Sequence, residues 1–110
     1  MLIDESLPEQ LEPFLIDVET STVRRERLKG LRNGVLLRAA VDRGFTMILS
    51  ADQSLRYQQN LSKIGIGAVV VSGVRSRMRE LTPLVPQILE ALSRVQLGEV
   101  VNVSPKATSG

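Results

Sequence analysis

Acidic residues at two separate places in the chain could together hold a metal ion. Asp4 and Glu5 end a short apolar run at the start of the chain, and Asp52 comes just after the apolar run of residues 45–50. Mg²⁺ and Mn²⁺ prefer oxygen ligands, so we expect these acids to bind one of the two cations. Such an ion can activate water and stabilise the charge that develops on a phosphoryl group. These three acids are therefore the candidate metal ligands.

The residue types that are missing narrow the possible chemistry. The 110 residues include no histidine and no cysteine. This excludes Ser-His-Asp triads, Cys-His dyads and imidazole bases, and it also excludes disulfides and thiolate–zinc sites. Any catalysis has to rest on carboxylates, hydroxyls, lysine, arginine or a metal held by oxygen ligands.

The charged residues are unevenly distributed, although the net charge is only +2. Residues 1–20 carry six acids and no base, whereas residues 24–43 carry seven bases and two acids, and a second basic cluster follows at residues 75–79. This pattern favours a polyanionic partner such as RNA, with Arg32 among the expected contacts, or an acidic protein. The alternative is that these charges form a solvated surface that aids solubility.

Apolar runs alternate with helical patterns along the chain. We expect strands over residues 1–4, 17–23, 45–50, 67–73 and 98–104. We expect helices over residues 6–16, 35–44, 52–64 and 75–95, the first of them short or kinked and capped by Ser6. The alternation predicts a three-layer α/β/α sandwich with a mainly parallel sheet of about five strands. In such a sheet ligands bind beyond the carboxyl ends of the strands, where Asp4 and Asp52 are expected.

The polar segment after Asp52 could extend this site. Arg56 could contact a phosphate, or it could pair with an acid such as Asp4. Tyr57 could stack on a base, or it could pack under a loop. Asp52 itself could cap the helix that follows, and this role is compatible with metal binding.

Three stretches resemble the small PIN-like domains, many of which are ribonuclease toxins of bacterial toxin–antitoxin pairs. These are "LIDESLP" at the start, "GLRNGVLL" in the middle and "ILSADQSLRYQQNL" after it, in the same order and spacing over roughly residues 1–72. The resemblance implies a PIN-like fold, Mg²⁺-dependent cleavage of RNA and an antitoxin protein as a partner.

The resemblance also assigns roles to single residues. Asp4 and Asp52 match metal-binding acids, and Asn33 falls where many relatives have an acid or asparagine. Val35 and Ser54 fall where relatives carry further acids, so the chain departs from the pattern at two positions. A catalytically degenerate PIN-like scaffold that binds RNA or protein without cutting is therefore the alternative.

Other expectations concern the chain as a whole. We expect one domain over residues 1–104, a disordered tail over residues 105–110, and a soluble cytoplasmic protein with no membrane association. The strand over residues 98–104 could lie at a sheet edge and pair with a second copy to form a homodimer. A receiver-like module is a further reading, but Lys63 and Lys106 are poorly placed for it.

Overall fold

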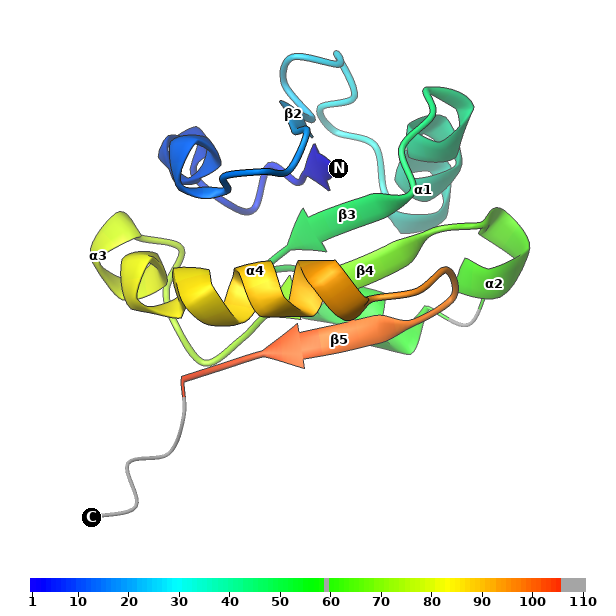
Figure 1. Ribbon diagram of the computed structural model, residues 1–110. Helices are drawn as coiled ribbons and strands as arrows, with labels where there is room; N and C mark the ends of the chain where they lie inside the picture. The colour runs from blue at the N-terminus through cyan, green and yellow to red at the C-terminus, as the bar shows by residue number, and fades with distance from the viewer. Residues whose placement is uncertain (59, 106–110) are drawn as a thin grey trace.

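The structure is a computed structural model that describes residues 1–58 and 60–105. A parallel sheet with the strand order β2-β1-β3-β4-β5 has helices on both faces, which confirms the predicted three-layer α/β/α sandwich (Figure 1). The strands are β1 (Leu2–Ile3), β2 (Ser21–Thr22), β3 (Met47–Ser50), β4 (Gly67–Val71) and β5 (Val100–Val103). The order places β5 at one edge of the sheet, as predicted.

Helical segments connect the strands. The α-helices are α1 (Asn33–Asp42), α2 (Leu61–Ile64), α3 (Met78–Leu81) and α4 (Val85–Arg94). The 3₁₀ helices are η1 (Glu9–Phe14), η2 (Gln53–Tyr57) and η3 (Thr82–Leu84). No helix in the described part of the chain is long and apolar enough to cross a membrane.

The side chains of each strand contribute alternately to two apolar cores, because successive strand residues point to opposite faces of a sheet. On one face, Ile3, Leu49 and Val69 pack with side chains from η1, α3 and α4, including the fully buried Ile88. On the other face, residues such as Ile48 pack with side chains from α1, η2 and α2. Both faces of the central strands are therefore covered, which explains their uninterrupted apolar sequence.

Two predicted helices are interrupted. The helix expected over residues 75–95 is divided into α3, η3 and α4, because Pro83 and Pro86 have no backbone N–H and are tolerated only in a first helical turn. The helix expected over residues 52–64 is divided into η2 and α2, and the backbone is extended at Gln58 between them.

The amino-terminal elements are also shorter than predicted. Pro8, not Ser6, occupies the position before η1, so the expected cap is wrong. Strand β2 has only two residues, and the chain turns at Asp17, where φ is 64°, before the strand begins. The predicted tail at residues 105–110 lies outside the described residues except for Pro105.

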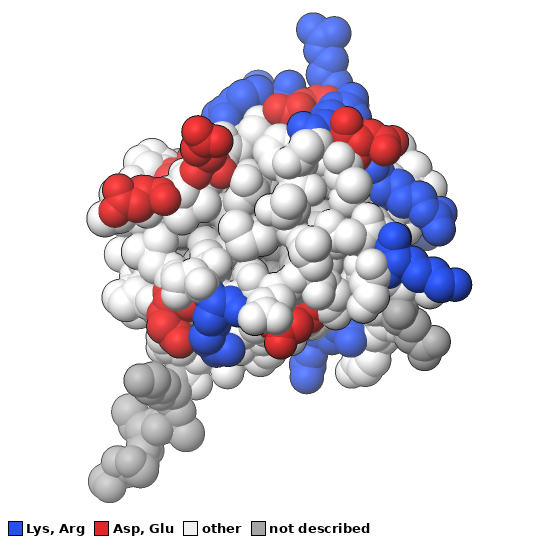
Figure 2. All heavy atoms as spheres, turned by 45° about the vertical axis from the view of Figure 1, so that its right-hand side comes forward, with Lys and Arg blue, Asp and Glu red and all other residues white. Residues whose placement is uncertain are grey.

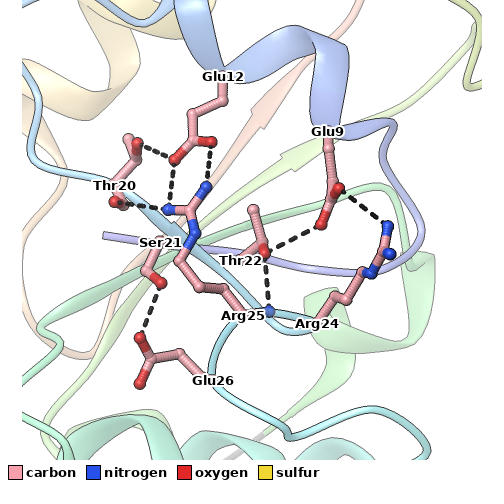
Figure 3. Close-up of polar contacts among 8 residues, drawn as sticks. All are labelled: Glu9, Glu12, Thr20, Ser21, Thr22, Arg24, Arg25 and Glu26. Carbon is pink, nitrogen blue, oxygen red and sulfur yellow. Dashed lines mark hydrogen bonds and ion pairs between the residues drawn. The ribbon is translucent and has the colours of Figure 1, made fainter.

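Ion pairs fasten this short edge strand to η1 (Figure 3). Both carboxylate oxygens of Glu12 accept hydrogen bonds from Arg25, at 2.7 and 3.0 Å, and one also accepts from Thr20 at 2.6 Å. Glu9 lies 3.5 Å from Arg24 and accepts a hydrogen bond from Thr22. These contacts hold the turn after β2 against η1, which a two-residue strand could not do alone.

The Arg25 guanidinium, through its hydrogen bonds, lowers the pKa of Glu12 below its usual value. A carboxylate with a lowered pKa in the folded state stabilises the fold above its unfolded pKa, and this stabilisation is lost as the pH falls through the folded pKa. We expect Glu12→Gln to lower the melting temperature by about 2–4 °C at neutral pH, a modest effect for an exposed pair. The difference from wild type should shrink below about pH 4.

Thermal unfolding followed by circular dichroism between acid and neutral pH would test this prediction. Glu90→Gln is the matched control, because Glu90 pairs with Arg94 one turn away on an exposed helix surface. A Glu12→Gln deficit that stayed constant across the pH range would contradict the ion-pair explanation.

Candidate functional site

The candidate site lies where the strand order of the sheet reverses direction. The chain passes from β1 to β2 on one side, and β3 then pairs with the other side of β1, with Leu2 opposite Ile48 and Ile3 opposite Leu49. In open parallel sheets with this order, the crevice beyond the carboxyl ends of β1 and β3 is the usual ligand site. Asp4 follows β1, and Asp52 follows β3.

Two serine hydroxyls hold the Asp4 carboxylate at this point. Ser6 and Ser50 both donate to Oδ2 of Asp4, at 2.7 and 2.8 Å. Asp4 is only 8% exposed, and Ser50 is fully buried. The second oxygen, Oδ1, has no hydrogen-bond partner within the described residues, and it is not among the fully enclosed unpaired atoms. One oxygen is therefore fixed by the protein, and the other remains available.

Asp52 is held by a local capping contact. Its Oδ1 accepts hydrogen bonds from the backbone N–H and the hydroxyl of Ser54, at 3.0 and 2.7 Å. Asp52 is thus the N-cap of η2, as the sequence indicated. The described residues place no protein donor on Oδ2, so this carboxylate also keeps one oxygen available.

The buried Ser50 links the two acids. Its hydroxyl donates to Asp4 and accepts a hydrogen bond from the backbone N–H of Asp52 at 2.9 Å. Ser6 accepts in turn from the backbone N–H of Ala51 at 2.9 Å. The carboxylate after β1 is therefore tied to the loop after β3 through side-chain hydroxyls.

Asn33 joins the same network from the start of α1. Its Nδ2 donates to the Ser54 hydroxyl at 2.8 Å, and that hydroxyl donates to Asp52. Ser54 therefore connects α1 to the loop after β3. Val35, in contrast, is 59% exposed and makes no contribution to this network.

A cavity of about 510 Å³, here called the site cavity, contains these groups. Its lining includes Asp4, Glu5, Ser6, Leu31, Arg32, Asn33, Leu36, Asp52, Ser54 and Leu55. Every residue predicted as a metal ligand or as catalytic therefore lines one cavity. Its volume is within the range typical of small-ligand sites.

Glu5 is partly engaged elsewhere. Its Oε1 accepts a hydrogen bond from the backbone N–H of Gly30 at 3.3 Å, which ties it to the turn after β2. Gly30 has a positive φ of 86°, so glycine suits this tight turn. Glu5 lines the cavity but also supports its wall.

The site offers few acidic ligands for a divalent cation. No group of three or more acidic, histidine or cysteine side chains close enough to hold a metal occurs in residues 1–58 and 60–105. Asp4 and Asp52 nevertheless each keep an oxygen available, and neither takes part in any of the four ion pairs recorded there. Two carboxylates suit a single hard cation completed by water, and they do not suit a two-metal site.

The predicted nucleic-acid contacts lie around the same edge of the sheet. Arg32 lines the site cavity, while Tyr57 is 77% exposed at the end of η2 and does not pack under a loop. Arg56 makes one weak contact, 3.5 Å from Gln53, and forms no ion pair with Asp4. The predicted alternative, in which Arg56 pairs with an acid such as Asp4, is therefore wrong. The Arg56 side chain is exposed.

Basic residues occupy the loops that follow the carboxyl ends of the strands. Residues 24–32 follow β2, Arg56 follows β3, and residues 75–77 follow β4. Figure 2 shows Lys and Arg side chains at the top of that view, mixed with Asp and Glu side chains, and further Lys and Arg side chains down its right side. A central acidic pair is thus bordered by cations, an arrangement suited to a phosphate-containing polyanion.

Fold and site together define an open parallel α/β domain with two carboxylates at its topological switch point. Searches against protein-family models, curated proteins and solved structures gave no match to this chain.

Sequence reasoning missed the roles of Ser6 and Ser50. Ser6 was expected to cap a helix, whereas it donates to Asp4 instead. Ser50 is the last residue of β3, one position beyond Leu49, which pairs with the last residue of β1, and this position was the available signal. A small polar residue at a strand end, beside an acid on the neighbouring strand, is the pattern to look for.

Proposed function

We propose that this chain is a PIN-like domain that cleaves RNA with the help of Mg²⁺ or Mn²⁺. The observation that carries the proposal is that Asp4 and Asp52, from separate strands, line one cavity at the switch point and each keep an oxygen available. The bordering cations support a polyanionic substrate.

Asp4 and Asp52 would hold the cation, and Glu5 could add an oxygen from the cavity wall. When bound, a divalent cation supplies a Lewis acid that activates water and offsets the charge on a phosphoryl group. Ser6 and Ser50 hold the Asp4 carboxylate in position, so it would not have to move when the cation binds.

The remaining residues would orient the substrate. Asn33 and Ser54 keep the Asp52 carboxylate aimed into the cavity, and Arg32 is placed to contact a phosphate there. Arg56 and Tyr57 extend from η2, where an exposed guanidinium and ring could hold a phosphate and a base.

The direct test is cleavage of a labelled single-stranded RNA by the purified protein. We expect cleavage in the presence of Mg²⁺ or Mn²⁺ and none after chelation with EDTA, because in this proposal the bound ion activates the attacking water. Cleavage that continued unchanged in EDTA, and that co-purified with the protein, would contradict the proposal.

If the protein is the toxin of a toxin–antitoxin pair, an antitoxin should bind it and block the site cavity. A gene for a small DNA-binding protein next to the coding gene would support this assignment. Co-expression with that neighbour should yield a stable complex with no RNA cleavage.

A non-cleaving PIN-like scaffold remains the second candidate. Val35 and Ser54 occupy positions where the resemblance leads one to expect acids, and the described residues contain no three-acid metal group. A scaffold would bind RNA or a protein and would leave RNA intact at every concentration of divalent cation.

A further inference from the structure

A second cavity lies on the other side of Asp4 and is here called the side cavity. Its volume is about 630 Å³, and it lies between η1 and the turn after β2. Asp4, Glu5, Thr22, Arg24 and Lys29 are among its lining residues. Neither the proposed chemistry nor the resemblance gives this cavity a role.

The two cavities are neighbours with a common wall. Asp4 and Glu5 line both of them. The turn after β2 also borders both, because Lys29 lines the side cavity and Arg32 lines the site cavity. Between these two residues, Gly30 donates its N–H to Glu5 and fixes the turn over the shared wall. The cavities therefore follow one another along the carboxyl edge of the sheet.

The charged residues that line the side cavity are the cations Arg24 and Lys29 and the carboxylates Asp4, Glu5 and Glu9, and Lys29 is the cation available to an anionic group. Lys29 takes part in none of the ion pairs recorded in residues 1–58 and 60–105, so its charge is not neutralised by a partner there. Arg24 lies 3.5 Å from Glu9, but its side chain is 80% exposed, so this pair is weak. Arg32 is likewise absent from those ion pairs. A cation is thus available on each side of Asp4.

We propose that single-stranded RNA lies across both cavities, with Lys29 contacting a phosphate on one side of Asp4 and Arg32 contacting one on the other. This inference rests on the proposed function and adds a second substrate subsite to it. A single strand of RNA carries one phosphate per nucleotide, so neighbouring phosphates can contact separate cations in two adjoining cavities. Each such contact adds a similar amount to the binding affinity.

The test measures RNA binding separately from cleavage. Fluorescence anisotropy of a short, labelled single-stranded RNA would be recorded in EDTA, where no cleavage is expected, at a series of salt concentrations. The variants are Lys29→Gln and Arg32→Gln. Lys63→Gln is the matched control. Lys63 lies in α2, which leads into the amino end of β4, whereas the two cavities lie at the carboxyl ends of the strands.

We expect Lys29→Gln and Arg32→Gln each to weaken binding at least about threefold at low salt and to reduce the salt slope by about 0.7, the contribution of one phosphate on a single strand. Lys63→Gln should leave both quantities unchanged. A Lys29→Gln protein that binds like Lys63→Gln, while Arg32→Gln binds weakly, would overturn the side-cavity subsite.

Parallel cleavage assays with Mg²⁺ keep the two proposals apart. Wild-type protein that cuts RNA, combined with unchanged affinity in Lys29→Gln, would overturn the subsite and leave the ribonuclease function standing. Binding that depends on Lys29, without cleavage by wild type, would support the subsite and overturn the ribonuclease function. Wild-type protein with no RNA binding at low salt would overturn the subsite.

Discussion

Asp4→Asn should reduce Mg²⁺-dependent RNA cleavage at least about 100-fold, and Asp52→Asn should do the same. Each substitution removes one of the two negative charges that would hold the cation, and losing a group that stabilises developing charge typically costs this much or more. Asparagine keeps a carbonyl oxygen that can accept the hydrogen bonds from Ser6 and Ser50, so the fold should be retained. Initial cleavage rates and circular dichroism spectra would check both points.

Asp17→Asn is the matched control for these two variants. Asp17 lies in the turn before β2, away from the site cavity, and asparagine tolerates its positive φ of 64°. Its activity should equal that of wild type. Equal cleavage by all four proteins would remove Asp4 and Asp52 from the mechanism.

Gly67→Ala should destabilise the fold by about 1–3 kcal/mol, or lower the melting temperature by roughly 5–15 °C. A Cβ atom at Gly67 would lie 2.7 Å from the backbone oxygen of Gln96 and 3.2 Å from Cγ2 of Val95. Backbone at this distance cannot move aside cheaply, because it belongs to the connection between α4 and the edge strand β5. Thermal and urea unfolding would measure the loss.

Gly34→Ala provides a control with the opposite expected sign. Gly34 lies in α1, where a Cβ would meet only the Nε2 atom of Gln58, at 3.8 Å. Alanine is favoured over glycine in a helix, so stability should be unchanged or higher by up to about 1 kcal/mol. Equal destabilisation of both variants would contradict the steric explanation for Gly67.

The sequence was sufficient to predict the α/β/α architecture because the central strands are covered on both faces. An uninterrupted apolar run such as residues 67–71 is typical of that environment. The helix ends were harder to predict. Pro83 and Pro86 each lie in the first turn of a helical segment, and the single helix predicted over residues 75–95 is divided there.

The site location followed from the same reasoning, since Asp4 and Asp52 come directly after strands that the structure makes neighbours. The supporting contacts could not be predicted, because they depend on long-range register. Ser50 reaches Asp4 across 46 positions, and Glu12 reaches Arg25 across 13. Nothing local in the sequence specifies which hydroxyl or guanidinium a given acid will meet.

Isothermal titration calorimetry of the purified protein with Mn²⁺ tests most directly whether Asp4 and Asp52 share one cation. We predict one bound ion per chain in wild-type protein and the loss of measurable binding in both Asp4→Asn and Asp52→Asn. Wild-type protein with no Mn²⁺ binding at millimolar concentrations, or variants with unchanged affinity, would contradict a metal site at the switch point.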